Sequence, residues 1–310
     1  MDSIEKAMLG RLGPVSPPLP ATPPDLPAKV DIIERATVGL MVAPPGGGVA
    51  GKPTVTVKRT ERSVVLDFQQ IQTMGLLVPE THRSRTKEEY RYIKRPLLMN
   101  VDGKGAAAVE HANLIVVTSA RPGEGKTFTA CNLALSIATE RNRTVLLVDA
   151  DVIKPSVAKT LGFEADLGLV DFLIDDQLDL ADVLVDTNVP SLTVLPAGGQ
   201  HHLSTELLAG ENMRRLAIEM SQRYPDRVVI FDSPPLLATT EASVLARLMG
   251  QVVMVVEAGR TQQSQVKEAL ALLDPNQIVG FVLNKTRGFS GPDYYGGSYG
   301  AGGGGGGVSA

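Results

Sequence analysis

The chain has 310 residues, of which 43% are hydrophobic and 21% are charged, and its formal net charge is −4. A slightly acidic chain offers no basic surface for sequence-independent binding to nucleic acid, so we expect no nucleic-acid partner. The single cysteine excludes an intramolecular disulfide framework. No apolar run approaches the roughly 18 to 20 residues that a membrane-spanning helix needs, and the N-terminus lacks the apolar core of a signal peptide, so we expect a cytoplasmic protein.

The two ends of the chain are poor material for a packed core. Ten of the 21 prolines lie in the first 53 residues, and ten of the 31 glycines lie in the last 20. Segments of this composition bury too little apolar surface to offset the entropy lost on folding. We therefore predict four parts: a proline-rich arm over residues 1–53 that opens with a short amphipathic helix at 2–12, a connecting segment over 54–104, a catalytic domain over 105–288 and a flexible tail over 289–310.

The connecting segment mixes apolar and polar residues. Residues 64–78 are expected to fold onto the catalytic domain. Residues 88–95 begin a helix that Pro96 is expected to distort, because proline removes a hydrogen-bond donor and clashes with the preceding turn.

From residue 113 onwards, short apolar runs alternate with segments of helical periodicity. The runs are too short for helices, and buried parallel strands have this continuous apolar character. We expect a mostly parallel, doubly wound α/β sheet with helices on both faces. The expected strands are 114–118, 144–149, 192–196, 228–232, 251–257 and 278–284. The expected helices are 127–140, 156–161, 167–174, 179–183, 204–222, 241–248 and 261–272.

The first expected strand runs into a glycine-containing turn that ends in Gly125-Lys126-Thr127. A turn between a buried strand and a helix N-terminus cradles phosphates with its backbone N–H groups, which predicts a P-loop NTPase fold. Lys126 is expected to reach the outer phosphates, and the Thr127 hydroxyl to bind Mg²⁺. Ala120 stands where the strict pattern has its first glycine. The residues expected to contact the nucleotide in this turn are Pro122, Gly123, Glu124, Gly125, Lys126, Thr127 and Phe128.

Three carboxylates follow two other expected strands. Asp149 and Asp151 end one apolar run, and Asp232 ends another. Because ligands bind at the carboxyl ends of parallel strands, these side chains are expected to collect beside the phosphates. The alternative for each of them is a helix cap or a turn, which is the common role of an aspartate after a strand.

Phosphoryl transfer requires positioning and charge neutralisation more than covalent help. We expect ATP with Mg²⁺, the metal being held by Thr127, Asp151 and Asp232, largely through its water shell. Binding the metal does not require all three carboxylates, so one of them is available for another role. We expect one of the pair Asp149 and Asp151, with Asp149 the stronger candidate, to orient or deprotonate an attacking hydroxyl.

Three ordered motifs carry a family resemblance: the loop Pro122-Gly-Glu-Gly-Lys-Thr127, the run Val148-Asp-Ala-Asp151 with Lys154-Pro-Ser156, and Phe231-Asp-Ser-Pro-Pro235. Over roughly residues 85–288 the chain resembles the bacterial tyrosine kinases of exopolysaccharide and capsule synthesis, which use P-loop ATPase architecture. The run Glu88-Glu-Tyr-Arg-Tyr-Ile-Lys-Arg-Pro-Leu97 is most similar to the exosortase-associated autokinases. The resemblance implies an ATP-dependent protein-tyrosine kinase that phosphorylates itself between subunits and regulates exopolysaccharide synthesis or export.

The resemblance gives a role to the C-terminal tail. Tyr294, Tyr295 and Tyr299 lie in a glycine-rich segment, and in the family such a tyrosine cluster is the autophosphorylation substrate. A flexible tail can place its hydroxyls in the cleft of another protomer, and each phosphate adds charge that loosens the assembly. The alternative is a low-complexity tail without this function.

Two motifs depart from the family pattern. Glu88, Arg91 and Lys94 occupy the family's helix motif for ring-like self-association, but the last position is normally arginine, whose bidentate contact lysine cannot repeat. The alternative is a solvated, charged helix face. Ile153 stands where the family usually has arginine, and Lys154 is the candidate to replace that charge.

The resemblance also implies partners. The family's kinase domains are activated by the cytoplasmic end of a membrane polysaccharide co-polymerase, which is fused to the kinase in some bacteria and separate in others. Since we expect no membrane-spanning segment here, the activator is expected on a separate chain, which would place the kinase peripherally at the inner membrane. A cognate tyrosine phosphatase is expected to reverse the modification.

Two residues relate the chain to other P-loop ATPases. Asn284 follows the last expected strand, where related proteins use an asparagine to contact adenine; the alternative is a turn asparagine. Arg121 lies where positioning ATPases of the MinD/ParA type carry a signature lysine. Such an ATPase, without tyrosine kinase activity, is the main alternative function. A degenerate nucleotide-binding regulator is a third, which the intact Lys126 and aspartates disfavour.

Overall fold

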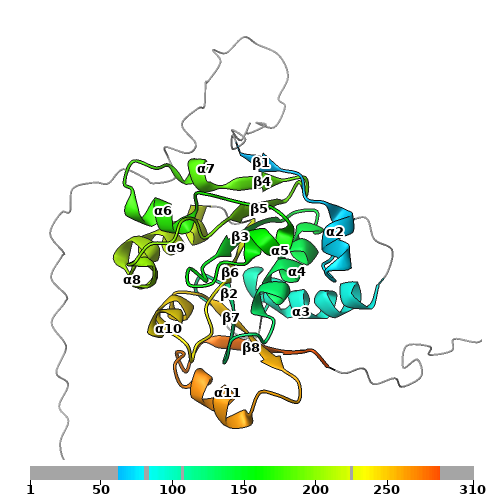
Figure 1. Ribbon diagram of the computed structural model, residues 1–310. Coiled ribbons are helices and arrows are strands. Elements are labelled where there is room, and N and C mark those ends of the chain that lie inside the picture. The colour runs from blue at the N-terminus through cyan, green and yellow to red at the C-terminus, as the bar shows by residue number, and fades with distance from the viewer. Residues whose placement is uncertain (1–61, 80–83, 106–107, 224–225, 287–310) are drawn as a thin grey trace, which may run out of the picture. The chain divides into compact units, whose positions relative to one another are not determined.

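The computed structural model describes residues 62–79, 84–105, 108–223 and 226–286 (Figure 1). The predicted helix at 2–12, the proline-rich arm and the tail tyrosines lie outside these residues. In the described ranges, no helix combines the length and the apolar character needed to cross a membrane.

A sheet of eight strands forms the centre of the described structure, in the order β1-β4-β5-β3-β6-β2-β7-β8. All neighbouring strands pair in parallel except β4 and β5, which are antiparallel. The mostly parallel sheet predicted from the sequence is therefore confirmed. The strands are β1 (Ser63–Val64), β2 (Leu114–Ser119), β3 (Thr144–Asp149), β4 (Val185–Thr187), β5 (Leu192–Leu195), β6 (Arg227–Asp232), β7 (Gln251–Glu257) and β8 (Ile278–Asn284).

Helices cover both faces of the sheet, as the doubly wound fold requires (Figure 1). One layer contains α2 (Phe68–Thr73), α3 (Arg85–Val101), α4 (Lys126–Ala138) and α5 (Val157–Leu161). The other contains α6 (Leu169–Ile174), α7 (Leu180–Val183), α8 (Ser204–Leu208), α9 (Glu211–Arg223), α10 (Thr240–Arg247) and α11 (Gln263–Leu270). Successive residues of β2 alternate between the two layers, Leu114 and Val116 facing one and Ile115 and Val117 the other, so the strand is apolar throughout.

Two expected helices differ from the structure. The single helix predicted over 204–222 is wrong: α8 and α9 are separate, and Gly210, which lies between them, donates its N–H to Leu207 in a tight turn. The helix expected at 88–95 is α3, which begins at Arg85 and continues past Pro96 to Val101, and the expected distortion at Pro96 stays a prediction. Pro96 lies on the exposed side of α3, so the hydrogen bond that proline cannot make is lost where water reaches the helix.

The segment before the P-loop shares a core with the helix that follows the loop. The Leu77 N–H donates to Asn132 Oδ1 of α4 at 2.7 Å. Tyr90 of α3 is buried against α4, and burial raises its pKa to about 12. The expectation that residues 64–78 fold onto the body is confirmed, because Leu66, Ile71 and Leu76–Val78 pack in the same core cluster as α4. The boundary at residue 104 stays a prediction.

Candidate active site

The turn between β2 and α4 has the conformation of a phosphate-binding loop. Gly123 and Gly125 have φ angles of 87° and 97°, in the left-handed region that favours glycine. A Cβ on Gly125 would also lie 2.1 Å from the Asn284 amide nitrogen, so a side chain at this position would displace Asn284 from its contact with the loop. Ala120 is fully buried, and its methyl group packs in the core, which explains why the missing glycine is tolerated there.

A buried glutamate holds the loop from inside. Glu124 is 2% exposed, and its carboxylate accepts hydrogen bonds from the Arg121 N–H at 2.6 Å and from the Thr261 hydroxyl. Thr261 lies between β7 and α11, 137 residues away in sequence. Thr261 is not predictable from the sequence, because a single threonine carries no signal of a contact over that separation.

The end of β8 holds the loop from outside. Asn284 donates from its side-chain amide to the Glu124 carbonyl at 2.9 Å, and Lys285 donates from Nζ to the Gly123 carbonyl at 2.6 Å. Lys285 also pairs with Glu257 at 3.2 Å. The structure thus places Asn284 at the phosphate-binding loop, while its adenine contact stays a prediction. Lys285 was not predicted, because its partner in the loop is a backbone carbonyl, which no sequence motif reveals.

The loop lysine and threonine reach the predicted carboxylates. Lys126 Nζ lies 2.6 Å from Asp151 Oδ2, and both side chains are largely buried. Burial disfavours the charged lysine, but the nearby carboxylates outweigh this effect and raise the pKa of Lys126. Thr127 Oγ1 donates to Asp232 Oδ2 at 2.6 Å and lies 2.9 Å from the Ser156 hydroxyl. The structure therefore brings together residues that are 25 and 105 positions apart in the chain.

Asp232 has the properties expected of a metal-supporting carboxylate. It is fully buried beside Asp149 in the β3–β6 register, and its Oδ1 has no hydrogen-bond partner among the described residues. Burial raises its pKa to about 8, although the Lys126 ammonium opposes this rise. A buried carboxylate oxygen without a partner fits a cation or the water shell of one.

The donor set fits Mg²⁺ better than a metal caged by protein. The described part of the chain contains no group of three or more His, Cys, Asp or Glu side chains placed to hold an ion. Mg²⁺ commonly keeps several waters and takes one or two carboxylates together with substrate phosphates. Thr127 and Asp232, in direct contact, therefore suit Mg²⁺ that arrives with a nucleotide.

Asp149 serves as a helix cap in this structure. Its Oδ2 accepts the N–H groups of Ser156 and Val157, both at 2.9 Å, at the start of α5. The capping alternative is thus realised. Burial nevertheless raises the pKa of Asp149 to about 6, close to the range in which a general base works best.

Ile153, which stands where the family usually has arginine, and its candidate replacement Lys154 follow closely after Asp151. Ile153 is 53% exposed, so an apolar side chain faces solvent at the position where the family usually has a charged arginine. The Lys154 N–H donates to Asp151 Oδ1 at 3.1 Å, and the lysine side chain is exposed. The backbone of Lys154 therefore orients Asp151, and the compensating charge of its side chain stays a prediction.

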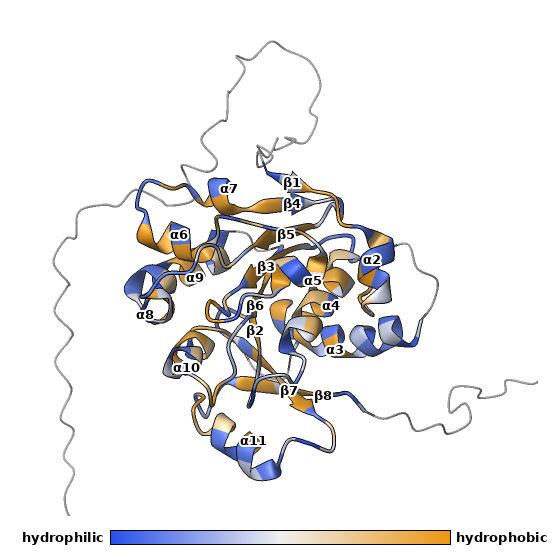
Figure 2. Ribbon diagram, viewed as in Figure 1, coloured by the Kyte–Doolittle hydropathy of each residue, from blue (hydrophilic) through white to orange (hydrophobic). Residues whose placement is uncertain are grey.

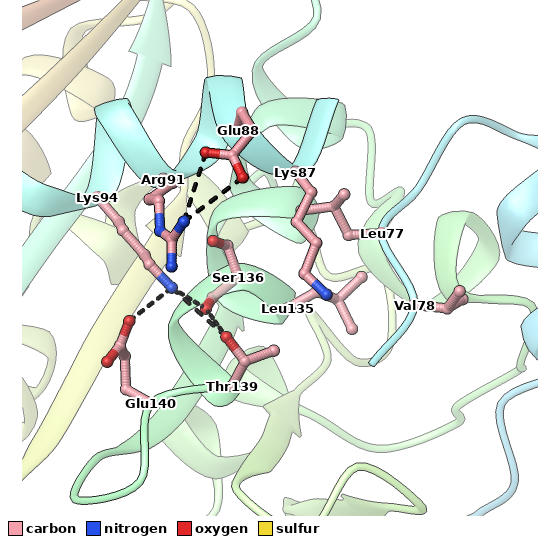
Figure 3. Close-up of a pocket in the computed structure, with 10 residues that line it drawn as sticks. All are labelled: Leu77, Val78, Lys87, Glu88, Arg91, Lys94, Leu135, Ser136, Thr139 and Glu140. Atoms are coloured by element: carbon pink, nitrogen blue, oxygen red, sulfur yellow. Dashed lines mark hydrogen bonds and ion pairs between the residues drawn. The ribbon is translucent and has the colours of Figure 1, made fainter. Parts of the chain in front are cut away.

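The helix motif on α3 is divided between solvent and core (Figure 3). Glu88 and Arg91 form an exposed pair at 3.4 Å. Lys94 is 7% exposed and points to the C-terminus of α4, where Nζ donates to the Ser136 carbonyl at 2.6 Å and pairs with Glu140 at 2.7 Å. All of these side chains line a cavity of about 330 Å³ between α3 and α4. Lys94 thus differs from Glu88 and Arg91 in being buried, although all three line the same cavity.

Comparisons with known proteins agree with this geometry. Residues 112–268 match a family model described as an AAA domain. The chain is 33% identical over 219 residues to the tyrosine-protein kinase YwqD of Bacillus subtilis (strain 168), covering 69% of this chain and 88% of YwqD. It is 34% identical over 236 residues to the succinoglycan biosynthesis transport protein ExoP of Rhizobium meliloti (strain 1021), covering 74% of this chain but only 29% of ExoP. The crystal structure of the chimerical protein CapA2B2 is similar with a TM-score of 0.58 at 26% identity, covering 72% of this chain and 92% of the other.

Lys94 caps the negative end of the α4 dipole from a buried position, so its removal should destabilise the fold. We predict that Lys94→Met lowers the free energy of unfolding by about 1–3 kcal/mol, because a buried carbonyl loses its charged donor. The matched variant Arg91→Met, whose side chain is 68% exposed, should change it by less than about 0.5 kcal/mol. Urea unfolding followed by circular dichroism measures both, and equal losses would contradict the capping role.

The raised pKa of Asp232 predicts a pH-dependent stability in the absence of Mg²⁺ and nucleotide. Between its unfolded pKa of about 4 and its folded pKa of about 8, the folded state keeps a proton that the unfolded state has released. Stability should therefore fall as pH rises through this window, by at most about 1.4 kcal/mol per pH unit. Urea unfolding in EDTA at pH 6.5 and 8 should show this loss in the parent chain. Asp232→Asn, which does not titrate, should flatten the profile.

Proposed function

The chain belongs to the family of bacterial tyrosine kinases built on a P-loop ATPase fold, and from that premise we propose that it phosphorylates the tyrosines of its own C-terminal tail between subunits. It is a protein-tyrosine kinase, as its named relatives are. One observation carries the proposal: Lys126, Thr127 and three buried aspartates converge at the carboxyl ends of adjacent parallel strands. The name of YwqD, a tyrosine-protein kinase, favours a kinase over a positioning ATPase of the MinD/ParA type.

We assign the nucleotide to the loop between β2 and α4. Lys126 exchanges its contact with Asp151 for the outer phosphates of ATP, and the loop amides before α4 bind the same phosphates. Thr127, Asp151 and Asp232 hold Mg²⁺, which neutralises phosphate charge when it is bound. The remaining P-loop contacts come from Pro122, Gly123, Glu124, Gly125 and Phe128, with Asn284 at the adenine.

Asp149 is the proposed proton acceptor for the tyrosine hydroxyl. In the transfer, the phenolic oxygen forms a bond to the γ-phosphorus, the bond to the β–γ bridging oxygen breaks, and ADP leaves. The phenolic proton goes to the Asp149 carboxylate. The raised pKa of Asp149, caused by burial, makes this carboxylate a better base than an exposed aspartate.

The acceptors are the three tail tyrosines. Tyr294 and Tyr299 follow Thr286, the last described residue, by 8 and 13 positions. A fully extended chain spans about 3.3–3.6 Å per residue, so these hydroxyls reach at most about 26–47 Å from the end of the described fold. That reach carries the hydroxyls beyond the described fold, as transfer between subunits requires. Each phosphate adds negative charge that weakens renewed binding in an acidic site.

Self-association and a membrane partner complete the proposal. The exposed pair Glu88 and Arg91 on α3 supplies the contact surface for a homo-oligomer, beside the cavity of Figure 3, with Lys94 supporting it from the core. We propose that a polysaccharide co-polymerase, on a separate chain at the inner membrane, activates the kinase. The phosphorylated kinase regulates exopolysaccharide synthesis or export, and a tyrosine phosphatase removes the phosphates from its tail. The name of ExoP, a biosynthesis transport protein, supports this setting.

Incubation with labelled ATP and Mg²⁺ tests the proposed function. Label should appear on tyrosine in the parent chain and fall by roughly 10³-fold or more in Lys126→Met, because the charge that binds the transferred group is lost. The variant Tyr294→Phe/Tyr295→Phe/Tyr299→Phe should lose most label but still hydrolyse ATP. Lys267→Met on α11, an exposed lysine, is the matched control and should keep full labelling.

Two outcomes would contradict this assignment. Label that persists in Lys126→Met would refute the nucleotide site. ATP hydrolysis without any phosphotyrosine in the parent chain would favour the positioning ATPase.

A further inference from the structure

Among the residues that the structure describes, the edge strand β8 lacks the features that protect sheet edges. It is the last strand of the sheet and pairs with β7 over all seven residues, while its other side meets no strand of the described part. Its sequence, Ile-Val-Gly-Phe-Val-Leu-Asn, contains no charge and no proline. Exposed edges are normally blunted by charges, prolines, bulges or a covering element, and an unprotected edge is a template for an added strand.

Two large apolar side chains lie exposed on this strand. Phe281 and Leu283 are 56% and 62% exposed, and Figure 2 shows the hydrophobic character of β8 at the end of the sheet. They share a face of the strand with Val279, which packs against the core. We call the free edge of β8 with Phe281 and Leu283 the β8 surface. Its backbone groups and its side chains both suit an extended, apolar partner segment.

The β8 surface leads to the nucleotide site. The last residue of β8, Asn284, donates to the carbonyl of Glu124 in the P-loop, and the next residue, Lys285, donates to the carbonyl of Gly123. A segment that lies along the free edge of β8 therefore has one end beside the loop that is proposed to hold ATP.

We propose that the β8 surface docks the tyrosine tail of a second copy of the chain, and this proposal rests on the proposed function. The tail suits an uncharged surface: residues 288–310 contain only one charged side chain, Asp293, and their aromatic residues include Tyr294 and Tyr295. A chain's own tail leaves from the carboxyl end of β8, so folding back along β8 would carry its tyrosines away from the P-loop. A tail from another subunit has no such constraint.

The docking explains how an acceptor without a defined motif is selected. Main-chain hydrogen bonds to the β8 edge tolerate the many glycines of the tail, and tyrosine rings pack on Phe281 and Leu283. Phosphorylation adds a charge of about −1.5 to −2 to a ring, which disfavours its packing on this apolar surface. The phosphorylated tail then leaves and the next tyrosine or tail enters.

A mixed reaction separates the two roles of the chain. The donor carries Tyr294→Phe/Tyr295→Phe/Tyr299→Phe, so it can transfer phosphate but has no tail acceptor. The acceptor carries Lys126→Met, so it has the tyrosines but no activity. Initial rates of tyrosine labelling are measured with labelled ATP at increasing acceptor concentration, both chains being full length. If the unmodified pair gives no transfer, the proposed function fails before the docking is tested, and the docking falls with it.

The decisive variant is Phe281→Ser/Leu283→Ser in the donor. It should raise the apparent KM for the acceptor by roughly tenfold and leave the KM for ATP unchanged, because apolar contact with the tail is lost. The same two substitutions in the acceptor should have no effect. Val244→Ser in the donor, at an exposed valine of α10, is the matched control and should not change either KM.

Three results would overturn the docking. They are an unchanged acceptor KM in the donor variant, an equal effect when the substitutions are in the acceptor, which would indicate a symmetric contact between copies, and an equal effect of Val244→Ser. A second donor variant, Leu283→Lys, adds a charge at an exposed position without removing buried area. It should give the same rise in acceptor KM, so the conclusion does not depend on the double variant folding normally.

Discussion

A lysine ammonium buried among three carboxylates is the interaction on which the rest of the site depends. Lys126 faces Asp151 directly, and Asp149 and Asp232 are neighbours across β3 and β6. When all are ionised, this cluster has an excess of two negative charges in a place that water hardly reaches. Desolvation therefore raises the pKa of both Asp149 and Asp232. A cation relieves this excess, and the phosphates of ATP compete for the lysine, so Mg²⁺ and nucleotide stabilise the site together.

The strands were predictable because the sheet is covered on both faces. Apolar runs such as that of β2 can be seen without any knowledge of their partners, and the aspartates that end β3 and β6 must meet once the strands are parallel. The two residues of β1 are too few to form a pattern. The break at Gly210 was missed because helical periodicity continues across it. Contacts such as that of Thr261 with Glu124 depend on tertiary proximity, which no local pattern encodes.

Lys94 shows a different limit of sequence reasoning. Its spacing from Glu88 and Arg91 places all three residues on one face of α3. The spacing alone does not tell whether that face is exposed to solvent or packs against another helix. The decision depends on α4, whose C-terminal carbonyl at Ser136 lies within reach of the ammonium. As a result α4 is held at both ends: its N-terminus meets the P-loop, and its C-terminus is fixed by the helix proposed for self-association. The proposed self-association and the proposed nucleotide binding therefore involve the two ends of one helix.

The buried Tyr90 has a consequence for an enzyme whose product is phosphotyrosine. Its side chain is 6% exposed in the core that α3 shares with α4, so it can receive a phosphate only if α3 separates from α4. Tyr92, two residues later, is 63% exposed and lacks that protection. A kinase that phosphorylates other copies of itself must act on regulatory tyrosines and not on tyrosines that stabilise its fold. Burial makes that distinction for Tyr90, because a tyrosine packed in the core is inaccessible to a second kinase molecule.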